Sequence, residues 1–155
     1  MTKIIGRNLT VENMPIPPIA RLIGFNIVEI DKGRAVMELE VEMKHLNPMG
    51  TLHGGIICDI ADAAMGMAYY STLGDGESFT TIELKTNFLK PVREGLLRAE
   101  GRVIKTGKTI GLLQCEVTDS KNSLVAFTTS TCMTLRGESA GGGDSSVAIL
   151  LYNTI

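Results

Sequence analysis

Hydrophobic and polar side chains alternate over residues 34–43, which read RAVMELEVEM. On an extended chain the apolar side chains share one face, while Arg34 and the glutamates share the other. An alternation with a period of two is typical of a strand that buries one face. The pattern therefore predicts a half-buried β-strand here.

The period changes after His53. Residues 54–73, GGIICDIADAAMGMAYYSTL, place apolar or small side chains on nearly every side of a helix. Such a helix is usually buried rather than lying on a surface. The sequence LGDGES then interrupts the pattern with two glycines, so we expect one long buried helix that ends near them.

Four β-rich runs follow this helix, over residues 79–92, 96–107, 109–120 and 123–135. Short separators divide them, and such separators are typical of turns. We therefore expect these four strands to form an antiparallel meander. A buried helix followed by a meander, with one or two strands ahead of it, predicts an α+β fold in which a curved antiparallel sheet wraps around a central helix.

The two ends of the chain differ from this middle part. Residues 1–20 contain PIPP, whose prolines favour an extended or turning lead-in over a helix. Beyond Arg136 the sequence becomes rich in glycine and serine before the short apolar stretch VAILLY. We expect a single domain over residues 1–136 and a flexible tail over 137–155, with VAILLY as an extra strand or contact.

The composition narrows the classes of function. The chain has 155 residues, of which 44% are hydrophobic and 21% charged, with a formal net charge of -2. It shows no basic stripe, so no nucleic-acid partner is expected. The three cysteines form no CxxC pair, which argues against a disulfide framework or a zinc site. No apolar run approaches the ~18 residues of a membrane span, so we expect a cytoplasmic protein.

Two stretches resemble known functional motifs, but their sequence context argues against both functions. GRVIKTGKT has one residue too many between its glycines for a phosphate-binding P-loop, and it lies between two predicted strands. GESAGG, residues 137–142, resembles the nucleophile elbow of carboxylesterases. No histidine follows Ser139 to act as its base, so an exposed Gly/Ser tail is the better interpretation.

The start of the predicted central helix carries the candidate chemistry. The first amides of a helix have no partner within the helix, and Gly54 and Gly55 leave them open to a carbonyl oxygen that becomes an oxyanion. Asp62 lies among apolar neighbours, where burying a carboxylate is costly unless it is paired or functional. Asp62 is therefore a candidate base or nucleophile, whereas Asp59 fits a solvated position better.

A distance argument separates these two features. At 1.5 Å per residue, Asp62 lies about 12 Å along the helix axis from Gly54, so one carbonyl group cannot contact both. If both act on the same bond, the second group must come from another chain whose helix runs alongside in the opposite sense. The site would then lie across a two-fold dimer interface.

The stretch HLNPMGTLHGGIICDIADAA resembles the signature of the PaaI-type acyl-CoA thioesterases of the hotdog-fold superfamily. The spacing Asn-x5-His-Gly-Gly, with an aspartate nine residues after the histidine, carries the likeness, which extends from about Ile19 to about Leu135. The resemblance implies a five- or six-stranded antiparallel sheet around a central helix, a homodimer or homotetramer, and hydrolysis of an acyl-CoA thioester without a cofactor or metal.

The resemblance also implies roles for individual residues. Gly54 would polarise the thioester carbonyl, Asn47 would help to hold the acyl group or its oxyanion, and His53 would orient the loop and the thioester. Asp62 of the partner chain would act as general base or as nucleophile, and Thr81 would help to place the water.

Further residues are expected around this centre. His45 is interpreted as structural. Gly55 would bind substrate beside Gly54. The phosphates of coenzyme A need cations, and the candidates are Lys90, Arg93, Lys105 and Lys108. The apolar walls of the acyl site could come from Met65, Met67, Tyr69, Tyr70 and Phe88, which suit an aromatic or medium-chain acyl group.

Other functions stay open from the sequence. One alternative is a hotdog enoyl or hydroxyacyl dehydratase, which also uses a histidine and an acidic residue at this helix. Another is a non-catalytic acyl-CoA-binding domain, against which Asp62 and Asn47 argue. An esterase that depends on Ser139 is the third.

Overall fold

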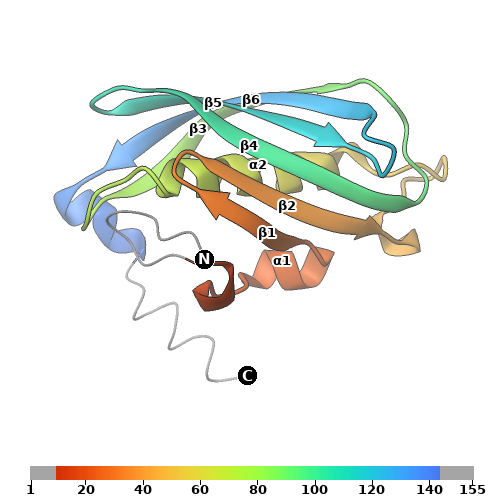
Figure 1. Ribbon diagram of the computed structural model, residues 1–155, viewed down its shortest axis with the longest axis horizontal. Helices are drawn as coiled ribbons and strands as arrows, with labels where there is room; N and C mark the ends of the chain where they lie inside the picture. Colours follow the sequence, from red (N-terminus) through yellow and green to blue (C-terminus); the bar gives the residue numbers. More distant parts are fainter. Residues whose placement is uncertain (1–9, 144–155) are drawn as a thin grey trace.

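The computed structural model describes residues 10–143, and Figure 1 shows its elements. In chain order these are η1 (Val11–Asn13), α1 (Pro18–Ile23), β1 (Asn26–Asp31), β2 (Arg34–Val41), η2 (Met43–His45), α2 (Gly54–Tyr70), β3 (Ser78–Phe88), β4 (Gly95–Thr106), β5 (Ile110–Thr118), β6 (Leu124–Leu135) and η3 (Gly137–Gly143).

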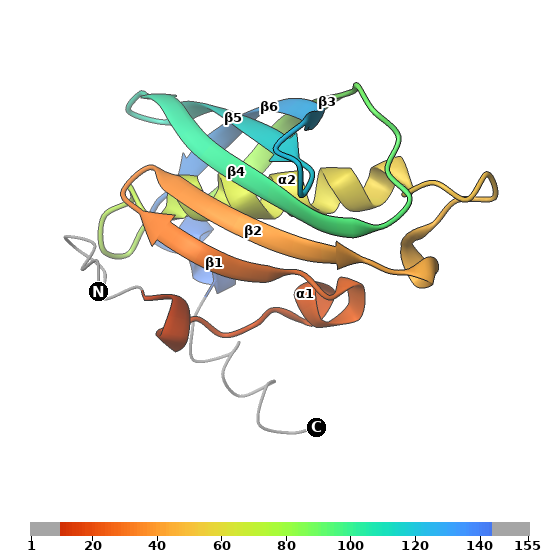
Figure 2. The same ribbon diagram turned by 45° about the vertical axis from the view of Figure 1, so that its right-hand side comes forward.

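One curved sheet wraps around α2 (Figures 1 and 2). The sheet has six strands in the order β1-β2-β4-β5-β6-β3, and every neighbouring pair is antiparallel. This arrangement confirms the predicted α+β class and the hotdog fold. The buried helix and the half-buried strand over residues 34–41 lie where the hydrophobic pattern placed them.

The expectation of a four-strand meander was wrong for β3. Strands β4, β5 and β6 are consecutive neighbours, but β3 pairs with β6 and forms an edge of the sheet. Residues 89–94 are therefore a crossover and not a turn. Leu89 and Lys90 both donate their amides to the carbonyl of Val125, which anchors the start of this crossover to β6.

The expected lead-in over residues 1–20 was wrong at its end, because α1 begins at Pro18. Proline is favoured at the first position of a helix, where its missing N–H would have no acceptor in any case. Gly24 ends this short helix with a φ of 98°, a left-handed conformation that glycine adopts without strain. Ala20 and Ile23 of α1 are buried in the core.

Glycines allow α2 to lie very close to the sheet. A Cβ on Gly101 of β4 would come within 2.5 Å of the Ala64 carbonyl group, and one on Gly111 of β5 within 2.3 Å of the Tyr69 ring. Facing the sheet, the helix carries small residues such as Ala61 and Ala64, which are fully buried. The position of α2 over the sheet is thus fixed by backbone contact, and the side chains at its rim are fixed with it.

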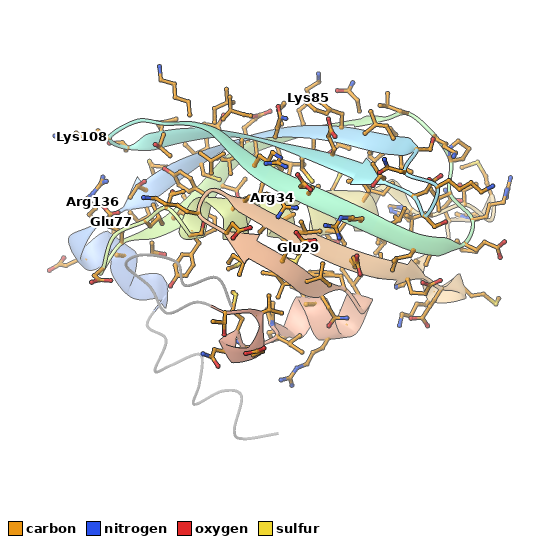
Figure 3. The ribbon with its side chains drawn as sticks, in the orientation of Figure 1. Glu29, Arg34, Glu77, Lys85, Lys108 and Arg136 are labelled. Atoms are coloured by element: carbon orange, nitrogen blue, oxygen red, sulfur yellow. The ribbon has the colours of Figure 1, made fainter. Side chains whose placement is uncertain are left out.

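The C-terminal part is only partly described. Arg136 pairs with Glu77 at 2.7 Å, and the 3₁₀ helix η3 follows (Figure 3). The VAILLY stretch lies outside the described residues, so the division into a domain over 1–136 and a tail over 137–155 stays a prediction. Within residues 10–143, no helix is long and apolar enough to cross a membrane. The expected cytoplasmic location also stays a prediction.

Candidate active site

Asp62 and Thr81 meet where α2 lies against the edge strand β3. The hydroxyl of Thr81 donates a hydrogen bond of 3.0 Å to Oδ1 of Asp62, and both side chains are half-buried. A hydrogen bond to a carboxylate stabilises its ionised form and fixes its orientation. The contact brings together the two residues that the resemblance links to the attacking water, and their roles stay a prediction.

A β-bulge aims Thr81 at the helix. Thr81 pairs with Cys132 and Glu83 pairs with Thr131, so Ile82 is an extra residue in β3. The Glu83 carbonyl accepts a hydrogen bond of 2.9 Å from the buried hydroxyl of Ser130. Because a bulge reverses the alternation of faces, odd-numbered residues face α2 before it and even-numbered residues face α2 after it. No feature of the sequence predicted a bulge at Ile82.

Asp62 and Thr81 belong to a longer line of contacts between α2 and β3, here called the helix–strand seam. Successive members on the helix are four residues apart, so they share one helix face. The contacts along the seam pair Gly54 with Phe88, Cys58 with Thr86, Asp62 with Thr81, and Gly66 with Phe79. Since β3 is an edge strand among residues 10–143, this seam lies at the side of the sheet that a second chain could approach.

The N-terminus of α2 offers one open amide. Nδ1 of His53 accepts the Gly55 amide at 2.9 Å, and the His53 carbonyl accepts the Ile56 amide at 3.0 Å. Over the described range, the Gly54 amide has no acceptor. Gly54 is therefore the available donor of this helix end, whereas the amide of Gly55, also predicted to bind substrate, is already satisfied by His53.

His53 caps this helix. It is the N-cap residue, and its exposed ring accepts from Gly55 through Nδ1. In the neutral ring the proton then lies on Nε2, which can face solvent or a ligand. The predicted role of orienting the loop fits this capping contact, and an orienting contact with a thioester stays a prediction.

Asn47 builds the loop before α2. Its Oδ1 accepts the amides of Met49 at 2.9 Å and Thr51 at 3.2 Å, while Nδ2 donates to Oγ1 of Thr51 at 2.9 Å. These bonds hold residues 47–51 in a compact turn. The side chain is thus largely engaged within its own loop, and the predicted hold on the acyl group would have to use the second N–H of Nδ2.

His45 is structural, as interpreted from the sequence. Its ring is buried, Nδ1 accepts the Glu42 amide at 2.9 Å, and Nε2 lies 2.6 Å from the Ile23 carbonyl. Because Nδ1 accepts an N–H, Nε2 carries the proton and donates it to that carbonyl. The ring therefore ties η2 to the end of α1.

The predicted phosphate-binding lysines lie at opposite ends of the molecule. Lys90 follows Phe88, whose ring contacts Gly54. It opens on a surface hollow of about 640 Å³, lined by parts of β2, the crossover and the β5–β6 turn. Lys105 and Lys108 lie at the β4–β5 hairpin, beside Gly111 and the C-terminal end of α2. Figure 3 shows Lys108 there.

Two cations at the hollow, Lys90 and Arg93, have partners in the same chain. Lys90 pairs with Asp119 at 2.6 Å, and this contact is the main cause that lowers the pKa of the Asp119 carboxyl to about 2. Arg93 donates to the Gly50 carbonyl at 3.1 Å and so ties the crossover to the loop before α2.

The expected acyl walls are only partly available. Met65 and Tyr69 are fully buried in the core, so they cannot line an open channel. Met67 and Tyr70 are half-buried, and Phe88 is exposed. The sequence placed the first four on the central helix and Phe88 on the following strand. It did not show which helix residues lie under the sheet and which lie at the seam.

Other titratable groups are not arranged for chemistry of their own. Burial, followed by the neighbouring charge of Asp62, raises the pKa of Asp59. Burial also raises the pKa of the thiols of Cys115 and Cys132, which keeps them protonated and unreactive. In the described part of the chain, no group of three or more His, Cys, Asp or Glu side chains is placed to hold a metal ion.

Ser139 lacks the setting of a nucleophile. It lies exposed in the 3₁₀ helix η3, which follows β6 but does not lead into a described α-helix. The turn from strand to helix that aims a catalytic serine is therefore missing from this part of the structure. This supports the interpretation that GESAGG is not an esterase motif here.

Comparisons with known proteins agree with this geometry. Residues 49–126 match the family model described as the thioesterase superfamily. A 1,4-dihydroxy-2-naphthoyl-CoA hydrolase from Listeria monocytogenes is 31% identical over 105 residues, which are 68% of this chain and 85% of the relative. The solved structure of the E. coli PaaI protein is similar with a TM-score of 0.73 at 27% identity, over 81% of this chain and 88% of that one. A thioesterase structure from Haemophilus influenzae has a TM-score of 0.81 over 86% of this chain and 95% of its own, and at 22% identity it shows the fold alone.

Proposed function

Because the chain belongs to the thioesterase superfamily and is a thioester hydrolase, we propose that it cleaves an acyl-CoA thioester into a free acid and coenzyme A at a site shared by two subunits. One observation carries the proposal. The open Gly54 amide and the Asp62–Thr81 pair lie on the same face of α2, two turns apart, beside β3, which is an edge strand of the described sheet.

The Gly54 amide would stabilise the developing charge. When water attacks a thioester, the carbonyl oxygen becomes an oxyanion, and a preorganised N–H at a helix N-terminus stabilises it. Any side chain at position 54 would contact the Phe88 ring, because a Cβ there would lie 2.8 Å from Cζ. The thiolate of coenzyme A then leaves with the electrons of the broken C–S bond, and the acid is released.

Asp62 would deliver the attacking oxygen. Among the described contacts, the carboxylate accepts a hydrogen bond at Oδ1 from Thr81, which leaves Oδ2 for water or for the thioester carbon. As a general base Asp62 takes a proton from the attacking water, and as a nucleophile it forms an anhydride that water then hydrolyses. Both routes give the same products. In either route Thr81 acts as a positioning residue.

The partner subunit would dock along β3. This strand has 11 residues and lies at the edge of the described sheet. It carries exposed apolar side chains at Ile82 and Phe88, and Leu89 just after it is exposed too. Edges of this length pair readily with another strand. Two β3 strands paired around a two-fold axis would place their α2 helices side by side and antiparallel, which brings Asp62 of each chain toward Gly54 of the other.

This dimer also gives the distant lysines a common role. The antiparallel helices would carry the C-terminal end of the partner's α2, with its β4–β5 hairpin, past the Gly54 end of the first chain. Lys90 of one chain and the partner's Lys105 and Lys108 would then face the same side of the site. Their ammonium groups could bind the phosphates of coenzyme A there.

A homotetramer would need a second interface. The outer face of the sheet carries exposed Ile110 and Leu112, which a second dimer could cover. The dimer is the assembly that the proposed chemistry requires, whereas the tetramer is not needed for a complete site.

Release of free thiol from acyl-CoA tests the reaction, and complementation tests the shared site. We expect Asp62→Asn and Gly54→Ala each to abolish most activity. Refolding the two variants together in equal amounts should restore about a quarter of the wild-type rate, because half of the dimers are mixed and each mixed dimer keeps one intact site. Full activity of Asp62→Asn, or water addition to crotonyl-CoA without thiol release, would contradict the proposal.

A further inference from the structure

The buried face of β6 carries a row of small polar side chains where a sheet that packs on a helix usually carries apolar ones. These alternate residues are Thr128, Ser130, Cys132 and Thr134. A buried hydroxyl group is costly unless it is hydrogen-bonded. Each hydroxyl of the row has a partner on β3 or α2, namely Thr86 for Thr128, the Glu83 carbonyl for Ser130 and Tyr69 for Thr134.

Ser130 differs from the two threonines because its partner is a backbone group. Its hydroxyl donates to the Glu83 carbonyl at 2.9 Å, and its side chain is fully buried. Glu83 directly follows Ile82, the extra residue of the bulge in β3. A bulge disrupts the ladder locally, so the backbone groups beside it need other partners. Ser130 therefore bonds β3 at the point where the register of this strand changes.

This register decides which side chain meets Asp62. Thr81 lies opposite Cys132 of β6, and Ile82 has no counterpart in that strand. Without the extra residue, Ile82 would take the place of Thr81 opposite Cys132, since a shift of one residue turns each side chain to the other face. Asp62 would then face an isoleucine, which has no donor, in place of the Thr81 hydroxyl.

A second contact links Ser130 to Thr81. The thiol of Cys132 lies 4.0 Å from Oγ of Ser130 and 3.9 Å from Oγ1 of Thr81. Both Ser130 and Cys132 are buried, so this part of β6 has little freedom to move. The position of the Thr81 hydroxyl is thus constrained through the backbone of β3 and through the side chain of Cys132.

We propose that Ser130 is a positioning residue for the reaction, because its bond to the Glu83 carbonyl holds the bulge that directs Thr81 toward Asp62. This inference rests on the proposed function. Ser130 has no contact with the carboxylate among the hydrogen bonds of residues 10–143, so its effect passes through Thr81. Loss of the Ser130 hydroxyl would remove the donor of a carbonyl at the bulge, and the Thr81–Asp62 bond would be formed less often.

A double-mutant cycle with Thr81→Val tests this route in the full-length chain. We expect Ser130→Ala to lower kcat for thiol release about fivefold, as for the loss of one neutral hydrogen bond, and to leave KM nearly unchanged. In the Thr81→Val chain, which has no hydroxyl to position, Ser130→Ala should lower kcat by less than about 1.5-fold. Ser130→Cys keeps the size of the side chain with a weaker donor, so it should resemble Ser130→Ala and can replace it in the cycle.

Thr128→Val is the matched control. Thr128 is also fully buried on β6, and its hydroxyl bonds the Thr86 side chain at 3.0 Å, away from the bulge. Thr128→Val and Ser130→Ala each remove one buried hydrogen bond, so both should lower the free energy of unfolding in urea. The effect of Thr128→Val on kcat should be the same in the wild type and in the Thr81→Val chain, whereas that of Ser130→Ala should not.

A wild-type kcat in Ser130→Ala or Ser130→Cys would overturn the role of Ser130 and leave the proposed hydrolysis intact. An equal fall of kcat in the wild type and in the Thr81→Val chain would overturn it as well, because Ser130 would then not act through Thr81. Failure of the wild-type chain to release thiol from acyl-CoA would refute the proposed function itself. Circular dichroism of each variant separates these results from a loss of folding.

Discussion

The bond between Thr81 and Asp62 gives the sharpest prediction for the proposed mechanism. Thr81→Val removes the hydroxyl that donates to Oδ1 of Asp62 at 3.0 Å, and it keeps a β-branched side chain of similar shape. Valine is favoured in strands, so β3 should keep its structure. The substitution therefore removes the hydrogen bond to the Asp62 carboxylate with little change to the fold.

The size of the effect follows from the charge of the acceptor. Hydrogen bonds to charged groups contribute about 1.5–3 kcal/mol. At about 1.4 kcal/mol for each factor of ten, the loss of such a bond in the transition state should lower kcat about 10- to 100-fold. KM should change less than about threefold, because Thr81 supports Asp62, which handles the attacking oxygen, and does not bind the coenzyme A leaving group.

Steady-state release of thiol from acyl-CoA measures both parameters. Thr80→Val is the matched control, because Thr80 is the preceding residue and is exposed on the opposite face of β3. Thr81→Ser, which keeps the hydroxyl, should recover most of the rate. If Thr81→Val retains the wild-type kcat, or if Thr80→Val loses as much, then the Thr81–Asp62 bond does not support catalysis.

Three further predictions address packing, assembly and pH. Gly101→Ala should destabilise the fold by about 1–3 kcal/mol or more, because its Cβ would lie 2.5 Å from the backbone of Ala64. Gly74→Ala is the control and should be nearly neutral, since the nearest contact of its Cβ would be a Glu77 carboxylate oxygen at 3.4 Å. Urea unfolding measures the stability of both variants, and equal stability would contradict the packing account. In the proposed dimer the two-fold axis passes midway between Gly54 and Asp62, at Cys58. A short bismaleimide should therefore join two wild-type chains on a denaturing gel but not Cys58→Ser chains, since Cys115 and Cys132 are buried. Failure to join wild-type chains would place the axis elsewhere. Side-chain hydrogen bonds from Arg98 and Arg34 lower the pKa of Glu29, and one from Arg34 lowers the pKa of Glu100, so the stability that they contribute is complete above the ordinary pKa of 4.5 and is lost as pH falls below it. Figure 3 shows Glu29 and Arg34 of this network. From a pH of about 5 to a pH of about 3, the melting temperature should therefore drop more in the wild type than in Glu100→Gln, and parallel drops would show that the network carries no pH dependence.

The hydrophobic pattern was sufficient for two elements, because it depends on local periodicity. Alternation over residues 34–43 predicted β2, and the nearly continuous apolar and small residues after His53 predicted a buried α2. The resemblance of the stretch from Asn47 to Asp62 was sufficient for the family, because its residue spacing is local too. Local spacing also placed the Gly54 amide and Asp62 about two helical turns apart.

Only the tertiary structure decided which strands pair and in which direction the side chains of β3 point. Periodicity gives the faces of a strand but not its neighbours, so it could not show that β3 crosses over to pair with β6 and leaves a free edge. The bulge at Ile82 reverses the faces of β3, and only this reversal lets Thr81 reach Asp62 and Phe88 reach Gly54. The sequence by itself determined which groups are present and how far apart they lie on the helix. Contacts between residues distant in the chain decided which of those groups are open, which are engaged, and where a second subunit can complete the site.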